Sequence, residues 1–109
     1  MKSEMIRNLN DTFRTSLFPA MGKLMFSDVL SQYPDAERQK IIGKVIEYDT
    51  WTEDNDPYGE HDFGAFDYMG DKLFWKIDYY DKNLEYGSED PSNPGMTTRV
   101  LTIMLASEY

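Results

Sequence analysis

The segment Asp54–Asp62, DNDPYGEHD, holds the densest group of side chains that could do chemistry. Aspartates at its first and third positions offer hard oxygen ligands, and Gly59 stands at the sixth position, as in calcium-binding loops. The pattern then fails, because Tyr58 occupies the fifth position and Ala65 stands where the bidentate glutamate belongs. We therefore predict a turn that leads into a strand. A divalent-cation site in this loop, with or without hydrolytic activity, is the alternative.

His61 is the only histidine of the chain, and histidine is the residue type most often used as a general base. On a strand it would share a face with Asp67 and Asp78, and either carboxylate could pair with it. A structural histidine beside Tyr80 is the other interpretation. The chain has no serine elbow, no glycine-rich phosphate loop and no cysteine. We therefore predict a protein that is not an enzyme and that has no catalytic residues and no cofactor.

Two strands, His61–Met69 and Lys72–Tyr80, are expected to form a hairpin around a two-residue turn, Gly70-Asp71. This turn would set Asp67 opposite Phe74 and Phe63 opposite Asp78. One face would turn to the core and carry Phe66, Tyr68, Leu73, Trp75, Ile77 and Tyr79. The other would carry His61, Phe63, Asp67, Phe74, Lys76, Asp78 and Tyr80. This second face is either a binding surface or partly covered by the last helix.

The elements around the hairpin predict the fold class. Ser3 is expected to cap a first helix, and a second helix is expected from Asp35 to about Tyr48, where isoleucine and valine recur on one face. Strands are expected at Lys23–Leu30 and Leu84–Gly87. Thr97–Tyr109 favours a helix, with a buried strand as the alternative. We predict one α+β domain over residues 1–109, in which a small antiparallel meander of three or four strands packs against two or three helices.

Charge is unevenly distributed over the 109 residues, whose formal net charge is −9. Residues 1–47 carry a net charge of +1, and residues 48–109 carry −10. Direct binding of nucleic acid is therefore not expected, because phosphates would meet carboxylates. No apolar run is long enough to cross a membrane, and the first twenty residues lack a signal peptide's apolar region. We expect a cytoplasmic protein whose partner is a protein with a basic surface.

Carboxylates at alternate positions of a strand repeat at about 6.6 Å, a spacing loosely comparable with that of phosphates. An acidic face of this kind would fit the basic groove of a DNA-binding protein, with aromatic side chains as anchors. The residues predicted to supply charge are Asp54, Asp56, Glu60, Asp62, Asp67 and Asp78. The predicted anchors are Tyr58, Phe63, Phe74 and Tyr80. A homodimer would also shield an exposed sheet face, although nothing in the sequence demands one.

Five segments carry a resemblance to a known family. They are NDTFR (10–14), DNDPYGEHDFG (54–64), WKIDYYD (75–81), GSEDP (87–91) and TRVLTIMLASEY (98–109). With them the chain resembles a small family of uncharacterised bacterial proteins, a domain of unknown function found largely in proteobacteria and on their plasmids and phages. The resemblance implies no established activity. Its mobile-element setting implies a gene that opposes host defence, and we expect an inhibitor of a nucleic-acid-binding defence complex, of the anti-CRISPR or anti-restriction type.

Overall fold

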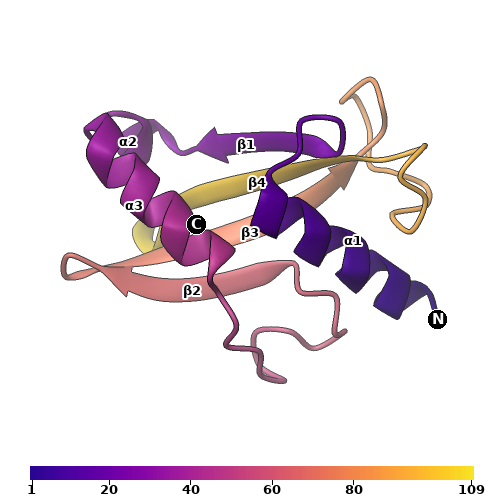
Figure 1. Cartoon of the computed structure of the whole chain (residues 1–109), viewed down its shortest axis with the longest axis horizontal. Coiled ribbons are helices and arrows are strands. Elements are labelled where there is room, and N and C mark those ends of the chain that lie inside the picture. Colours follow the sequence, from indigo (N-terminus) through magenta and orange to yellow (C-terminus); the bar gives the residue numbers. More distant parts are fainter.

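In a computed structural model that describes all residues from 1 to 109, helices cover one face of a four-stranded sheet (Figure 1). The helices are α1 (Lys2–Ser16), α2 (Asp28–Ser31), α3 (Asp35–Ile46) and the 3-10 turn η1 (Ala106–Glu108). The strands are β1 (Gly22–Phe26), β2 (Phe63–Tyr68), β3 (Asp71–Tyr80) and β4 (Thr98–Leu105). The predicted α+β class is confirmed. None of these helices combines the length and the apolar composition that a membrane-spanning helix needs.

The sheet has the order β1-β4-β3-β2, and it is mixed rather than antiparallel throughout. β1 pairs parallel to β4, with Lys23 opposite Val100, whereas the other two pairings are antiparallel. The predicted meander is therefore wrong in one pairing. The helices α2 and α3 and the β2–β3 hairpin lie between β1 and β4 in the chain, so the connection is long enough to bring β4 alongside β1 in the same direction.

The prediction for Lys23–Leu30 is correct only in its first half. β1 ends at Phe26, and the hydroxyl of Ser27 accepts a hydrogen bond from the Leu30 amide at 3.3 Å, which starts α2. Ser followed by Asp is a typical helix start. The sequence therefore does indicate α2, but the alternation of apolar residues over Lys23–Leu30 favours a strand more strongly. Leu30 of α2 is fully buried in the core. The predicted helix after Pro34 is confirmed as α3.

The C-terminal segment is a strand, so the helix favoured for Thr97–Tyr109 is wrong. Arg99, Leu101 and Ile103 are buried toward the helices, and the residues between them face the other way. Three of the first five residues of β4 are β-branched, which favours a strand. The predicted strand Leu84–Gly87 is reduced to one bridge, between Tyr80 and Gly87, because Leu84 adopts a left-handed conformation (φ 59°).

The hairpin turns at Met69-Gly70, one residue earlier than predicted. Both turn residues have positive φ, 52° and 86°, as a type I′ turn requires. Asp67 therefore lies opposite Lys72, not Phe74, and Phe63 lies opposite Lys76, not Asp78. Because the register differs by two residues, the side chains of β2 and β3 stay on the faces that were predicted for them.

Odd-numbered residues of β3 and β4 form the core with the helices. Trp75 is completely buried and lies so close to Gly64 that a Cβ there would overlap the indole. The opposite side of the sheet, which we call the open face, lies away from α1, α2 and α3 (Figure 1), and Tyr109 packs on Phe63 and Phe74 at one end of it. Its residues include Lys23, Met25, Phe63, Asp67, Lys72, Phe74, Lys76, Asp78, Tyr80, Val100 and Thr102.

Candidate functional site

The structure divides the predicted binding residues between two places. Phe63, Asp67, Phe74, Asp78 and Tyr80 lie on the open face, as predicted. The others lie in the segment 47–62, which joins α3 to β2 and which we call the acidic loop; they are Asp54, Asp56, Tyr58, Glu60 and Asp62. The two groups therefore form different surfaces, one in the sheet and one beyond the edge strand β2 (Figure 1).

The acidic loop carries seven carboxylates and no lysine or arginine. Four of them are exposed and make no side-chain hydrogen bond or ion pair: Glu47, Asp49, Glu53 and Asp54. This stretch is the longest region of uncompensated charge in the chain, because no lysine or arginine occurs between Lys44 and Lys72. Its potential attracts a cationic surface and is screened by salt.

Side-chain hydrogen bonds hold the loop in one shape. The side-chain Nδ2 of Asn55 donates to the Thr50 carbonyl at 3.0 Å, and the side-chain Oδ1 of Asn55 accepts from the backbone amide of Thr52 at 3.0 Å. A carboxylate oxygen of Asp56 accepts from the backbone amide of His61 at 2.9 Å. Asn55 and Asp56 thus stabilise the turn that was predicted for this segment. No group of three or more His, Asp or Glu side chains in the chain has the arrangement of a metal site.

His61 points away from the open face, so its predicted pairing with Asp67 or Asp78 and its predicted place beside Tyr80 are both wrong. The residue adopts φ 54°, and this left-handed conformation rotates the side chain toward α1. The Nδ1 atom lies 2.9 Å from a carboxylate oxygen of Asp11, and Nε2 lies 3.5 Å from Asp56. The ring also stacks on Trp51 at 3.8 Å between centroids. Both ring nitrogens therefore face carboxylates, one of α1 and one of the acidic loop.

Asp11 connects His61 to a buried arginine. Arg14 is 4% exposed, lies 3.3 Å from the Asp11 carboxylate, and donates two hydrogen bonds to the last carbonyls of α3, those of Val45 (2.8 Å) and Ile46 (3.0 Å). Its guanidinium also lies over the Trp51 ring at 5.3 Å. Arg14 therefore caps α3 and fixes the point at which the acidic loop leaves the helix.

A second buried network attaches the other end of the loop. Asn10 is fully buried and donates to the Glu60 carbonyl at 3.0 Å and to the Tyr79 hydroxyl at 2.8 Å. Its oxygen accepts from Arg99 Nε at 2.6 Å, and Arg99 also donates to the Pro91 carbonyl at 2.6 Å. Burial lowers the pKa of Arg99 and raises the pKa of Tyr79. These two networks join α1, the acidic loop, β3 and β4.

Sequence reasoning missed Asn10, Arg14 and Arg99. The signal was present in α1, where Asn10 and Arg14 share one helical face with the apolar residues Ile6 and Phe13. A polar residue on an apolar face indicates a buried hydrogen-bonding role.

Glu60 and Asp62 are only partly available to a partner, although both were predicted as binding residues. A carboxylate oxygen of Glu60 accepts a hydrogen bond from the Tyr79 hydroxyl at 3.1 Å. Burial raises the pKa of Asp62, and the nearby charges of Glu60 and Asp56 raise it further. The exposed aspartate and glutamate side chains earlier in the loop are therefore better placed to meet a partner than these two.

The open face does not carry the row of free carboxylates that the phosphate-spacing argument required. Asp67 lies across from Lys72 in the hairpin, and Asp78 forms an ion pair with Lys76 at 2.8 Å. Around these charges the face is apolar and aromatic. The acidic surface of this protein is therefore the loop and not the sheet.

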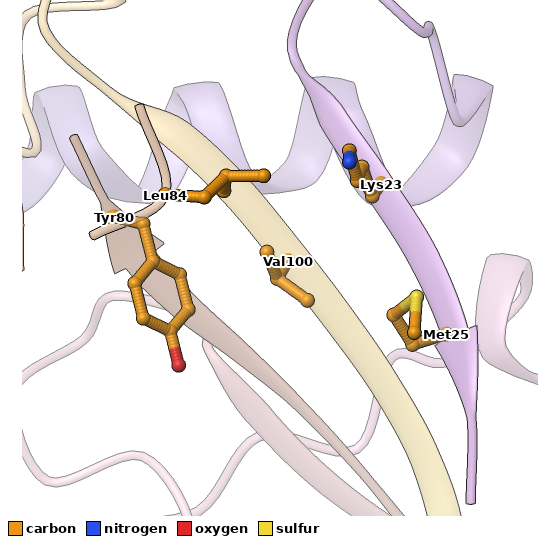
Figure 2. A pocket seen from close by; sticks show the side chains of 5 residues that line it. All are labelled: Lys23, Met25, Tyr80, Leu84 and Val100. Carbon is orange, nitrogen blue, oxygen red and sulfur yellow. The ribbon is translucent and has the colours of Figure 1, made fainter. Parts of the chain in front are cut away.

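Two apolar features lie at opposite ends of the open face. At one end Tyr109 packs edge to face on Phe63 and Phe74, whose own rings are tilted against each other; the ring centroids are 5.1 to 6.1 Å apart, and we call the three residues the aromatic cluster. At the other end is a hollow of about 250 Å³. Figure 2 shows Leu84 extending over β4 toward Val100, with Tyr80 on one side and Lys23 and Met25 on the other.

Comparison with known proteins identifies a family but no characterised relative. The sequence model of the family described as "Protein of unknown function (DUF3768)" matches residues 26–108. No curated protein and no solved structure matches the chain. The matched range includes the acidic loop, β2, β3 and β4, whereas α1 and most of β1 lie before it. Asn10 and Arg14 therefore reach the matched region from outside it.

Proposed function

Since the chain belongs to DUF3768, a family of proteins of unknown function, its role has to be inferred from its own surfaces, and we propose that it is a non-enzymatic module that binds a protein partner with a basic surface. One observation supports this most directly. The acidic loop presents seven carboxylates without a single lysine or arginine, and hydrogen bonds that involve the side chains of Asn55 and Asp56 fix its shape. A fixed array of charge binds a complementary surface with little loss of entropy.

The partner class that fits best is a nucleic-acid-binding protein, because its groove is built to attract phosphates. We propose that the acidic loop occupies such a groove in the cytoplasm and so inhibits a host defence complex, as the resemblance to a family found on plasmids and phages implies. Occupation of the groove would exclude nucleic acid by competition. The charge comes from the loop. The protein would therefore imitate the negative potential of a nucleic acid, and not the spacing of its phosphates along a strand.

The arrangement of His61 supports a role without catalysis. Its two ring nitrogens face Asp11 and Asp56, its ring is stacked on Trp51, and it lines neither of the two pockets of the molecule. No group of side chains in the loop has the arrangement of a metal site, and we therefore do not propose the alternative of a divalent-cation site.

The test compares two triple variants that remove the same charge from different places. Asp49→Asn/Glu53→Gln/Asp54→Asn neutralises three exposed carboxylates of the acidic loop, and Asp71→Asn/Glu85→Gln/Glu89→Gln neutralises three exposed carboxylates elsewhere. Each protein is immobilised, exposed to a bacterial lysate at about 50 mM and about 500 mM salt, and the captured proteins are identified by mass spectrometry.

We expect wild type and the second variant to capture the same nucleic-acid-binding protein at low salt, and the loop variant to bind it at least about tenfold more weakly. Added DNA should displace the captured protein. Equal binding by the two variants, or capture that survives both high salt and added DNA, would contradict the proposal.

A further inference from the structure

The open face differs from the rest of the molecule in its charge. It carries three lysines (Lys23, Lys72 and Lys76) against two aspartates (Asp67 and Asp78), whereas the whole chain has a net charge of −9. The negative charge of the protein therefore lies outside this face. The open face would attract a basic partner only weakly. We therefore infer that it binds a different partner from the one proposed for the acidic loop.

We propose that this partner is a second copy of the chain, bound face to face. Two copies in this orientation keep their acidic loops at the margins and bring together surfaces that are nearly neutral. Apolar side chains already form much of the face, and stacked sheets pack about 10 Å apart through such side chains. The assembly would be a four-layer dimer, with the helices of both copies outside and the two sheets inside.

A two-fold axis that lies between the two sheets, perpendicular to the strands, and passes β3 at Ile77 gives a self-complementary arrangement. It sets Lys76 of each copy opposite Asp78 of the other, so each ion pair within one copy (2.8 Å) gains an intermolecular counterpart. It also sets Phe74 opposite Tyr80. Phe74, which belongs to the aromatic cluster, would then pack against Tyr80, which borders the hollow of the other copy. The same contact occurs twice, as two-fold symmetry requires.

The area available is sufficient for a specific but weak dimer. Eight residues of β4 at about 3.3 Å each and four strands at about 4.8 Å give a face of about 26 by 19 Å. Two such faces bury about 1,000 Å², which is where specific interfaces begin. The dimer should therefore dissociate on dilution in the micromolar range, and its mass should be measured over a range of concentrations.

The test uses one methionine on the open face and one on the helical side. Met25 and Met5 are 48% and 52% exposed, so Met25→Glu and Met5→Glu make the same chemical change at nearly the same exposure. Sedimentation equilibrium from about 1 to 500 µM should show wild type and Met5→Glu approaching twice 12.8 kDa, with Met25→Glu weakened at least tenfold. A wild-type protein that remains at 12.8 kDa throughout, or equal effects of the two variants, would overturn the proposal.

A charge swap tests the arrangement of the two copies. Asp78→Lys alone places like charges opposite each other and should weaken the dimer, whereas Lys76→Asp/Asp78→Lys restores opposite charges and should recover it. Failure of the double variant to recover the dimer, with the circular dichroism spectrum unchanged, would overturn the two-fold arrangement. The acidic-loop triple variant should dimerise like wild type, so this proposal and the proposed function fail separately.

Discussion

Replacing Asn10 with alanine should destabilise the fold more than any other exchange of this size in α1. The side chain is completely buried and makes three hydrogen bonds, to the Glu60 carbonyl, the Tyr79 hydroxyl and Arg99 Nε. Alanine leaves the Arg99 Nε–H without a partner in a buried position. The loss of a hydrogen bond to a charged group and the desolvation of an orphaned donor together amount to about 3–5 kcal/mol.

This loss is large compared with the whole stability of a small domain, about 5–15 kcal/mol. Since 1 kcal/mol corresponds to about 4–8 °C in Tm at this size, a loss of about 3–5 kcal/mol should lower the Tm by about 12–40 °C. Urea unfolding followed by the fluorescence of Trp51 and Trp75 measures the change. Asn8→Ala is the matched control, because Asn8 is an exposed asparagine of the same helix with no side-chain hydrogen bond, and it should change stability by less than about 0.5 kcal/mol. A loss below about 1 kcal/mol for Asn10→Ala would refute the assigned role of the network.

Three further outcomes are expected. Gly64→Ala should lower the free energy of unfolding by at least about 1–3 kcal/mol in urea titrations, because the new methyl group overlaps the Trp75 indole; an unchanged midpoint would show that the strands can separate there. Burial raises the pKa of Asp62, so its ionisation destabilises the fold above that pKa and the penalty disappears as the carboxyl is protonated in acid. Asp62→Asn should therefore raise the urea midpoint at pH 7 and lose this advantage at acidic pH, and a gain that is the same at both pH values would contradict this. Calcium or magnesium at about 1 mM should leave Tm unchanged within about 1 °C, and a rise that EDTA reverses would instead favour the cation site.

The parts of the fold that follow from local pattern were predictable. The alternation in β3 assigned Leu73, Trp75 and Ile77 to the core, and this assignment survived a register error because an error of two residues leaves the faces unchanged. β4 was predicted only as the alternative to a helix, because its Met and Leu content favours a helix, whereas its strand conformation depends on pairing with both β1 and β3, which no local pattern reveals.

The candidate site was predictable only where charge alone identifies it. The carboxylates of the acidic loop are visible in the sequence, and the loop conformation was correctly assigned from its turn residues. The contacts that hold the loop were not visible, because Asn10 and Arg99 are 89 residues apart and Asp11 and His61 are 50 residues apart. The left-handed backbone of His61, which turns it off the open face, depends on the same distant contacts.

The position of β4 has a consequence for how the chain acquires its structure. β4 is the last strand in chain order, yet it lies between β1 and β3, so β1 has no partner in the sheet until β4 has been synthesised. During translation the hairpin β2–β3 and the helix α3 can form early from local contacts, whereas β1 must wait for a segment more than seventy residues later. Closing so long a loop is slow, and it leaves an unpaired strand exposed to other chains in the meantime. Folding should therefore be completed only after the last strand has left the ribosome, in a single late step that orders both halves of the molecule together.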